Sequence, residues 1–402
     1  MATGGAGVAP QPPPVSAAVD GGYPDGAIHG GPTVNGASAQ GPQPAVRTNA
    51  DGQHRYRNSG GNGPYYAALD LGTNNCRLLV AAPRSRGFRV VDAFSRIVRL
   101  GEGVSATGLL AEEAMARSIA ALRICGAKLR DREVHRARLI ATEACRAAAN
   151  GAEFVERVRT ETGLELEIVS QDVEARLAVA GCASLVDQQA EGVILFDIGG
   201  GSSELVWIDL RAQVDPRRRR MADRIRAWKS LPVGVVTLTE RYGGVDVTND
   251  LFERMVADVD AMLETFPQSA ALSAAVARGA MHMLGTSGTV TTLAGVHLGL
   301  KRYDRRLVDG VWLTDDQVGE LNHRVVTMNY DERVADPCIG RERADLVISG
   351  CAILEAVRRR WPCARLRVAD RGLREGVLVE MMAQDGVWRT RRRGPRRRHG
   401  RT

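Results

Sequence analysis

Apolar and polar positions follow the same pattern in two separate stretches of the chain. In each stretch, a short apolar run ends near an aspartate, a glycine-containing polar turn follows, and a second apolar run begins. Short β-branched-rich runs joined by a tight turn are typical of two buried strands in a β-hairpin. The two stretches are AALDLGTNNCRLLV, from Ala67 to Val80, and VILFDIGGGSSELVWI, from Val193 to Ile208.

The separation of the two hairpins indicates how the chain is organised. Asp70 and Asp197 lie too far apart for a solenoid repeat, so the pattern predicts a domain that has been duplicated within one chain. Two such hairpins that face each other would form a cleft with an aspartate on each side.

Apolar periodicity predicts further elements around both hairpins. After the first hairpin, strand, helix and strand follow in the order expected of a ribonuclease-H-like unit. The predicted strands cover 88–94, 137–142, 164–169 and 228–236, and a further strand begins at Met281 and ends in a turn before a helix that starts near Thr289. The other predicted helices cover 111–129, 153–162, 239–242 and 251–266, and one more begins at Asp172. The fold class is therefore α/β, with two ribonuclease-H-like domains that flank a cleft.

The turn of the second hairpin has the composition of an anion site. Three successive glycines, Gly199 to Gly201, allow positive φ angles and aim consecutive backbone N–H groups inward, which forms an anion-binding nest. Asp197 and Glu204 would repel a phosphate unless a cation lies between them, and Mg²⁺ suits such oxygen ligands. Many glycine-rich turns only connect strands, but the second copy in the first hairpin favours phosphate binding.

Charge and composition narrow the class of protein. The net charge of +7 becomes −1 when the eight arginines of residues 389–402 are left out, so the basic charge belongs to a tail rather than to the body. No run reaches the ~18 apolar residues of a membrane span, and the first residues, MATGGAGVAPQPPPVS, lack the basic and apolar regions of a secretory signal. The seven cysteines form no CxxC pair, which favours neither disulfides nor zinc. We therefore expect a cytoplasmic protein without membrane contacts.

Three segments differ in composition from the rest. Residues 1–64 are rich in Gly, Pro, Ala and Ser and have hardly an apolar run, so we expect a disordered tail. Residues 387–402 form a second, Arg-rich disordered tail that either contacts a polyanion, such as polyphosphate or RNA, or has no partner. The run Arg217 to Arg220 is either the solvated tip of a hairpin or a contact for a polyanion that extends out of the cleft.

The pair DLGTNN and DIGGGSSE resembles the two phosphate motifs of the exopolyphosphatase/guanosine pentaphosphate phosphatase (Ppx/GppA) family, within the actin-like, sugar kinase and heat-shock ATPase superfamily. The resemblance extends from Tyr65 to about Ala383, and further motifs agree in order. These motifs are ATEACR from Ala141, QDVEARL from Gln171, TSGTV from Thr286, RADLVISG from Arg343 and DRGLREGVL from Asp370.

The resemblance implies a domain plan and an activity. Residues 65–172 would form actin-like domain I, with 372–386 packing back on it, and residues 173–371 would form domain II. Longer family members carry an extra C-terminal domain of the His-Asp phosphohydrolase type, for which this chain ends too soon. The implied activity is Mg²⁺-dependent hydrolysis of a terminal phosphoanhydride.

Two further residues gain a role mainly through the resemblance. Glu174 lies in the first turn of a predicted helix, where a glutamate ordinarily complements the helix dipole; the family places its catalytic base here. Arg146 follows a strand end, where position alone leaves it either solvated or a bidentate phosphate ligand; the resemblance favours a catalytic role at the phosphate. Glu143 is a weaker candidate for the base.

The remaining site residues are predicted from the two hairpins and from the turn at Thr286. That turn alone would also be explained as a tight packing turn between a strand and a helix. We expect the metal to be held by Asp70, Asp197 and Glu204, and phosphate by Gly72, Thr73, Asn74, Gly199, Gly200, Gly201, Ser202, Ser203, Ser287, Gly288 and Thr289.

Three functions are compared with these residues. The first is an exopolyphosphatase that releases orthophosphate from the end of inorganic polyphosphate, and the second is a guanosine pentaphosphate 5′-phosphohydrolase, which the motifs do not separate from the first. The third is an actin-like ATP-binding protein or sugar kinase, which fits the phosphate cradle but not Glu174 together with Arg146. A homodimer is left open.

Overall fold

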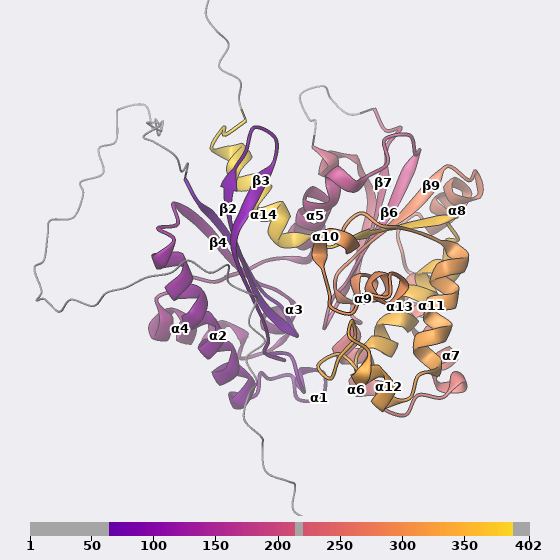
Figure 1. Cartoon of the computed structure of the whole chain (residues 1–402), viewed down its shortest axis with the longest axis horizontal. Coiled ribbons are helices and arrows are strands. Elements are labelled where there is room, and N and C mark those ends of the chain that lie inside the picture. Colours follow the sequence, from indigo (N-terminus) through magenta and orange to yellow (C-terminus); the bar gives the residue numbers. More distant parts are fainter. Residues whose placement is uncertain (1–63, 214–219, 389–402) are drawn as a thin grey trace, which may run out of the picture. The chain divides into compact units, whose positions relative to one another are not determined.

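The computed structural model describes residues 64–213 and 220–388, which form two β-sheets with their helices (Figure 1). The predicted tail over 1–64, apart from Pro64, lies outside the described residues, as do Arg217 to Arg219 and the arginines of 389–402. The packed chain extends to Trp388, since its indole Nε1 donates to Arg84 O at 2.9 Å. Val387 and Trp388, which were expected to belong to the second tail, thus pack against the folded body.

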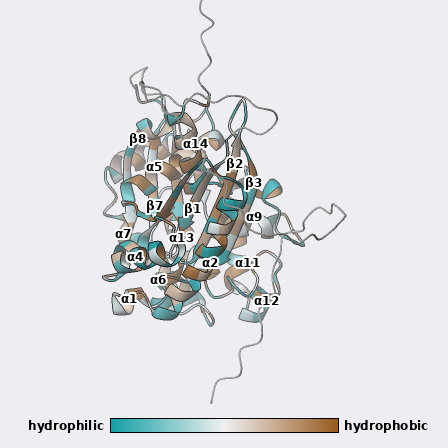
Figure 2. Ribbon diagram, turned by 90° about the vertical axis from the view of Figure 1, so that its left-hand side faces the viewer, coloured by the Kyte–Doolittle hydropathy of each residue, from teal (hydrophilic) through white to brown (hydrophobic). Residues whose placement is uncertain are grey.

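The first sheet has the strand order β3-β2-β1-β4-β5. The first three strands are antiparallel, and β4 and β5 continue the sheet in parallel to β1. In Figure 2 the inner strand β2 is mostly brown, whereas the edge strand β3 carries much teal, in keeping with their burial. The elements are β1 (Tyr66–Leu71), β2 (Asn75–Pro83), β3 (Phe88–Ile97), α1 (Val104–Thr107), α2 (Glu112–Asp131), β4 (Arg136–Ala141), α3 (Glu143–Ala147), α4 (Gly151–Thr162) and β5 (Glu167–Ile168).

The second sheet repeats this topology. Its order is β10-β11-β9-β6-β7-β8, in which β6, β7 and β8 are antiparallel and β9 and β11 follow in parallel. The extra strand β10 pairs antiparallel with β11. The strands are β6 (Gly192–Ile198), β7 (Ser203–Asp209), β8 (Ile225–Leu231), β9 (Met281–Thr286), β10 (Trp312–Thr314) and β11 (Arg365–Ala369).

Helices cover the second sheet, and two more lie between the sheets. The helices of the second sheet are α6 (Val235–Tyr242), α7 (Asn249–Leu263), α8 (Ser269–Ala277), α9 (Gly288–His297), α10 (Arg305–Val308), α11 (Asp315–Thr327), α12 (Tyr330–Ala335) and α13 (Val347–Arg360). The two between the sheets are α5 (Gln171–Cys182) and α14 (Leu373–Gln384), and short 3₁₀ turns cover Ala183–Leu185 and Met221–Arg224.

This architecture confirms the predicted α/β fold with two ribonuclease-H-like units. The duplicated hairpins open the two sheets as β1–β2 and β6–β7, so they occupy equivalent places. The predicted strand 228–236 is wrong in its second half, because β8 ends at Leu231 and Val235 begins α6. The apolar run over that boundary reflects burial on two different elements rather than one continuous strand.

The described residues contain no helix that is long and apolar enough to cross a membrane. All seven cysteines are buried and unpaired, so the fold depends on packing rather than on disulfides.

Helices α5 and α14 meet at two glycines. A Cβ on Gly181 would lie 1.9 Å from Gly372 O, and a Cβ on Gly376 would lie 2.0 Å from Leu177 O. Both distances are far below van der Waals contact, so the two backbones touch directly. On its other side α14 packs against the first sheet through Val377 and Met381, and α5 packs against the second sheet through Val179.

The Gly181→Ala variant should therefore be less stable by about 1–3 kcal/mol, because the added methyl group forces the two helices apart. Thermal unfolding would measure the loss. The matched control is Gly126→Ala in the buried face of α2, where a Cβ would meet its nearest atom at an ordinary 3.5 Å; this change should be neutral or stabilising by up to about 1 kcal/mol. Equal melting temperatures for the two variants would contradict the close helix crossing.

Candidate active site

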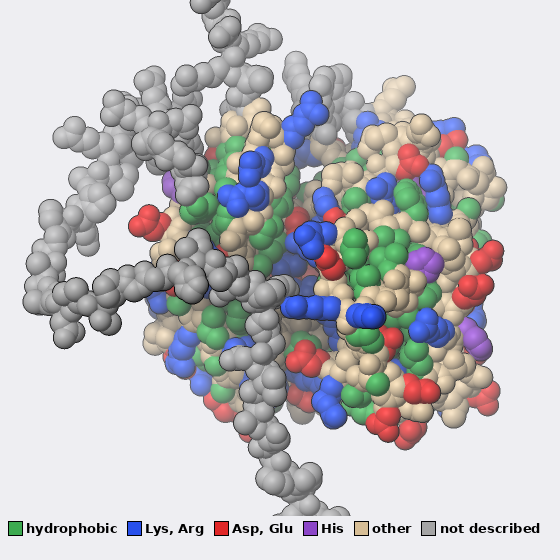
Figure 3. Space-filling model, viewed as in Figure 1, with side chains coloured by type: hydrophobic (Ala, Val, Ile, Leu, Met, Phe, Trp, Pro, Cys, Tyr) green, Lys and Arg blue, Asp and Glu red, His purple; other side chains and the backbone are tan. Residues whose placement is uncertain are grey.

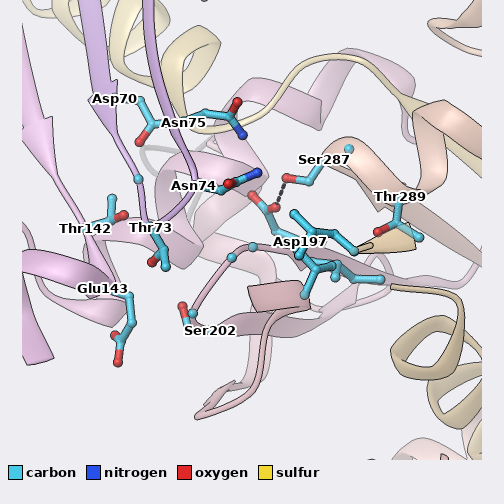
Figure 4. Close-up of a pocket in the computed structure, with 18 of the residues that line it drawn as sticks. Asp70, Thr73, Asn74, Asn75, Thr142, Glu143, Asp197, Ser202, Ser287 and Thr289 are labelled. Carbon is cyan, nitrogen blue, oxygen red and sulfur yellow. Dashed lines mark hydrogen bonds between the residues drawn. The ribbon is translucent and has the colours of Figure 1, made fainter. Parts of the chain in front are cut away.

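The loops of the two hairpins lie together around one cavity of about 140 Å³ (Figure 4). Figure 4 shows Asp70, Thr73 and Asn74 of the first hairpin opposite Asp197 and Ser202 of the second. The rest of the lining comes from α5, from α9, from the segment that begins at Arg343, and from Thr142, Glu143, Val235 and Leu373. The sequence-predicted cleft between the duplicated hairpins is thus present in the structure.

The glycines of the second loop are needed for close approach rather than for positive φ. None of Gly199, Gly200 and Gly201 has a positive φ angle, so that part of the sequence argument is wrong. A Cβ on Gly200 would lie 2.9 Å from Thr73 Cβ, and a Cβ on Gly201 would lie 2.8 Å from Thr73 Oγ1. The absence of side chains lets the two phosphate loops touch.

Backbone hydrogen bonds fix the second loop from behind. The carbonyls of Gly199 and Gly200 accept from the first amides of α6, those of Val235 and Val236, at 2.9 and 2.8 Å. Among the described residues, the amides of Gly200 and Gly201 donate to no acceptor. These two N–H groups remain available to an anion in the cavity.

The strand register sets the acidic groups of the second hairpin. Asp197 and Glu204 are directly opposite each other on β6 and β7, so their side chains share one face of the sheet. Glu204 Oε1 accepts from the hydroxyls of Ser202 and Ser230, both at 2.9 Å. Asp197 Oδ1 accepts from the Ser287 hydroxyl, as the dashed line in Figure 4 shows. Each carboxylate keeps its other oxygen for a ligand.

The first hairpin places a different pair at the equivalent positions. Asp70 on β1 is opposite Arg77 on β2. Neither side chain has a hydrogen bond or ion pair within the described part of the chain, and both line the cavity. The second hairpin therefore supplies two acids, Asp197 and Glu204, whereas the first supplies one acid and one base, Asp70 and Arg77.

Glu174 lies in the first turn of α5, where it is buried with 9% relative exposure and lines the cavity. Arg146 Nη1 donates to Glu174 Oε2 at 2.9 Å and to Val169 O at 2.7 Å, while its Nη2 donates to Glu143. The guanidinium of Arg146 is thus occupied by two carboxylates and is not part of the cavity lining. In this structure Arg146 holds the Glu174 carboxyl in place.

The turn after β9 contributes a strained residue. Ser287 caps α9 with a φ of 76°, a left-handed conformation that is costly outside glycine and is found at functional sites. This conformation aims the Ser287 hydroxyl at Asp197. Gly288 and Thr289 follow in the first turn of α9 and line the cavity, where the free amides of a helix N-terminus suit an anion.

The carboxyl groups of the cavity are held in an environment that disfavours their charge. Burial, with repulsion from Asp197, raises the pKa of Glu204 to about 7. Burial also raises the pKa of Asp70 to about 6, against the attraction of Arg374 and Arg77, and it raises the pKa of Asp197. For Glu174, burial and repulsion from Glu204 outweigh Arg146 and raise the pKa to about 9. Glu143 lines the cavity as well, so its acidic side chains outnumber its two basic ones, Arg77 and Arg343, by five to two.

A divalent cation fits this donor set. The acids offer only hard oxygens, with one uncommitted oxygen each on Asp197 and Glu204 and the whole carboxyl of Asp70. Among the described residues, no three His, Cys, Asp or Glu side chains are close enough to hold a metal ion alone. Mg²⁺ ordinarily keeps several waters and takes one or two carboxylates plus substrate phosphates, so a sparse set of this kind suits it.

Most of the predicted site residues come together, but two do not face the cavity. These two are Arg146 and Ser203. The Ser203 hydroxyl is buried and donates to Val233 O at 2.7 Å instead of facing the cavity. Ser203 is the first residue of β7, so strand alternation turns its side chain away from that of Glu204. The predicted residues that line the cavity are Asp70, Gly72, Thr73, Asn74, Glu174, Asp197, Gly199, Gly200, Gly201, Ser202, Glu204, Ser287, Gly288 and Thr289.

Sequence reasoning missed two basic residues of the lining. Arg343 reaches the cavity and donates from Nη1 to Thr292 Oγ1 at 3.0 Å. Arg343 lies far from both hairpins in sequence, and its only sequence signal is its place in the motif RADLVISG. Arg77 carried a usable signal, because it stands in the first hairpin where Glu204 stands in the second.

Two ribonuclease-H-like units that close on a glycine-lined, carboxylate-rich cavity define a phosphoryl-transfer protein. The model of the Ppx/GppA phosphatase family matches residues 79–385. The chain therefore belongs to the Ppx/GppA phosphatase family, and its activity class is that of a phosphatase.

Solved structures agree with this assignment. An Aquifex aeolicus member of the Ppx/GppA family is 29% identical, with a TM-score of 0.64, over 80% of this chain and 98% of its own. An exopolyphosphatase-like protein is 27% identical, with a TM-score of 0.68, over 79% of this chain and 97% of its own. An exopolyphosphatase from Cytophaga hutchinsonii is 24% identical over 80% of this chain and 98% of its own, and its TM-score of 0.70 supports the fold.

Proposed function

We propose that this protein is an exopolyphosphatase that hydrolyses the terminal phosphoanhydride of inorganic polyphosphate with Mg²⁺ and releases orthophosphate. The observation that carries the proposal is the composition of the cavity. Two sets of backbone amides, two basic side chains and five acids converge there, and none of the lining residues is aromatic. The lining offers a place for phosphoryl groups but no ring on which a guanine or adenine could stack.

The surroundings of the cavity also suit a polyanion. Arg77 and Arg343 line it without a carboxylate within ion-pair distance among the described residues. Figure 3 shows further Lys and Arg side chains gathered at the hollow between the two α/β units. Successive phosphates of a polyphosphate chain can be neutralised by such groups, whereas a nucleoside would meet mainly charge.

In the proposed reaction, the terminal phosphoryl group lies between the two loops and accepts hydrogen bonds from the Gly200 and Gly201 amides and from the N-terminus of α9. A water molecule attacks phosphorus while Glu174 takes its proton, and the bridging P–O bond breaks so that the shortened chain leaves as an anion. Arg146 holds the Glu174 carboxyl in place. Arg77 and Arg343 stabilise charge on the leaving chain.

Asp70, Asp197 and Glu204 would hold Mg²⁺. When bound, the ion neutralises charge on the phosphate oxygens and polarises the phosphoryl group. Since burial and repulsion from Glu204 raise the pKa of Glu174 to about 9, its carboxyl is mostly protonated at neutral pH in the ligand-free protein. A base role for Glu174 therefore requires a lower pKa in the loaded cavity than in the ligand-free protein.

The test is the ratio of kcat/KM for long-chain polyphosphate, guanosine pentaphosphate and ATP, measured with the same enzyme and the same Mg²⁺ concentration. We expect polyphosphate to exceed both nucleotides by at least about tenfold, which corresponds to about 1.4 kcal/mol in transition-state binding. A higher value for guanosine pentaphosphate would replace the proposal by the second candidate of the same family. A higher value for ATP would reject both.

A further inference from the structure

The two halves of the cavity are also joined outside it, by contacts that we call the clasp. On the side of the first sheet the clasp consists of Arg99, Gly103 and Ser105, and on the side of the second sheet it consists of Glu240 and Asp345. Arg99 Nη2 lies 3.1 Å from Asp345 Oδ2. The Gly103 amide donates to Glu240 Oε1 at 2.7 Å, and the Ser105 hydroxyl donates to Glu240 Oε2. Figure 1 shows the corresponding helices, α1 and α6, side by side.

The clasp residue Arg99 is fixed to the first phosphate loop. The amides of Val98 and Arg99 both donate to Asn74 O, at 2.9 and 3.0 Å, and the Gly101 amide donates to Thr73 O at 2.9 Å. The Val98 and Leu100 side chains on either side of Arg99 are fully buried in the core of the first sheet. Any movement of the backbone at Arg99 would therefore move the phosphate loop with it.

The backbone at Arg99 is strained. Its φ is 47°, a left-handed conformation that glycine adopts freely and an arginine adopts only at a cost. The backbone alone would favour glycine at this position. Compared with glycine, an arginine at this position adds a side chain that forms the ion pair with Asp345.

On the opposite side, the clasp residues are fixed to the other parts of the cavity. Glu240 belongs to α6, whose first amides hold the carbonyls of Gly199 and Gly200. Asp345 follows two residues after the cavity residue Arg343. The buried Arg333 holds that segment by donating to Ala344 O at 2.7 Å.

We propose that Arg99 is a positioning residue which, through Asp345 and together with Glu240, keeps the first phosphate loop in register with the second loop and with Arg343. A single phosphoryl group has to be contacted from both sides, so its affinity depends on the fraction of molecules in which the loops are aligned. The helix crossing at Gly181 and Gly376 links the two units in another place, and the clasp adds a second point of attachment.

The Arg99–Asp345 pair contributes to alignment far more than to overall stability. Both side chains are partly exposed, at 36% and 21%, and exposed ion pairs add little to the free energy of unfolding because water screens them. Removal of the pair should accordingly leave the melting temperature nearly unchanged. An effect on loop distance or on KM would then report on positioning.

The first test needs no substrate and is independent of the proposed function. Nitroxide labels are attached to Glu113→Cys on α2 and Asp250→Cys on α7, which are exposed, while the native cysteines are all buried. Pulsed electron paramagnetic resonance should give one distance for the otherwise unchanged protein. In Arg99→Gln and Asp345→Asn backgrounds, we expect a second, longer population. A distance distribution identical to that of the unchanged protein would overturn the proposal.

The second test is a double-mutant cycle on polyphosphate hydrolysis, which rests on the proposed function. Arg99→Gln and Asp345→Asn should each raise KM by about two- to fivefold, the range expected for an exposed pair, with kcat changed by less than about twofold. The double variant should show no larger increase than either single variant. Multiplying effects, or unchanged KM values, would refute coupling between the two residues.

The matched control is Arg123→Gln, which removes an ion pair of 2.7 Å to Glu161 on the side of the first sheet alone. This variant should leave the label distance and KM unchanged. A rise in KM equal to that of Arg99→Gln would mean that the loss of any surface arginine weakens polyanion binding, and it would also overturn the proposal. If the unchanged enzyme released no phosphate, the proposed function would fail while the label distances still decided the role of the clasp.

Discussion

Replacement of Glu174 by glutamine should lower kcat for phosphate release by about 10²- to 10⁴-fold, the usual contribution of a general base, and leave KM within about twofold. The amide keeps the size and polarity of the carboxyl and can still accept a hydrogen bond from Arg146. What it loses is the ability to take a proton from the attacking water. Steady-state phosphate release at saturating Mg²⁺ measures the effect.

The control for this variant is Asp172→Asn. Asp172 lies in the same first turn of α5 but is half exposed, pairs with Arg176 at 3.0 Å, and does not line the cavity. Its replacement should leave kcat within about twofold. Turnover of Glu174→Gln within threefold of the unchanged enzyme would remove Glu174 from the mechanism.

Loss of either acid of the second hairpin should weaken Mg²⁺ binding. Asp197→Asn and Glu204→Gln each remove one negative charge from the face that the two residues share. We expect the Mg²⁺ concentration for half-maximal activity to rise by about tenfold or more in each variant, since carboxylate charge is what holds the ion. Calorimetric titration of the substrate-free protein with Mg²⁺ gives a second readout that does not depend on turnover.

Asp209→Asn is the matched control for the metal ligands. Asp209 ends the same strand β7 and pairs with Arg226 at 3.2 Å, outside the cavity. Its Mg²⁺ requirement should equal that of the unchanged enzyme. Activity that persists in a chelator, or identical Mg²⁺ titrations for all variants, would contradict the assignment of the acids to a metal.

The sequence predicted what depends on local pattern. The two hairpins and their aspartates could be found because each combines an alternation of short apolar runs with a glycine turn, and because the pattern occurs twice. Strand register then places Asp197 opposite Glu204 without further information. The role of Glu174 in the cavity came from the resemblance, since a glutamate in the first turn of a helix has an ordinary explanation.

What the sequence could not predict depends on distant packing. Arg343 enters the cavity because Arg333 and α6 position its segment, and no local pattern reports those contacts. The glycines of the second loop proved necessary because Thr73 of the other hairpin touches them, not because of their φ angles. In the same way, Arg146 was expected at the phosphate, but Glu143 and Glu174 take up its guanidinium.

The most direct test of the account is the chain-length distribution of products from long polyphosphate incubated with Mg²⁺ and analysed at early times by gel electrophoresis together with a phosphate assay. The unchanged enzyme should release orthophosphate from the start without generating mid-length fragments, and Glu174→Gln should release it at least about a hundredfold more slowly. Mid-length chains at early times, which indicate internal cleavage, or equal release by both proteins, would contradict hydrolysis of the terminal phosphoanhydride in this cavity.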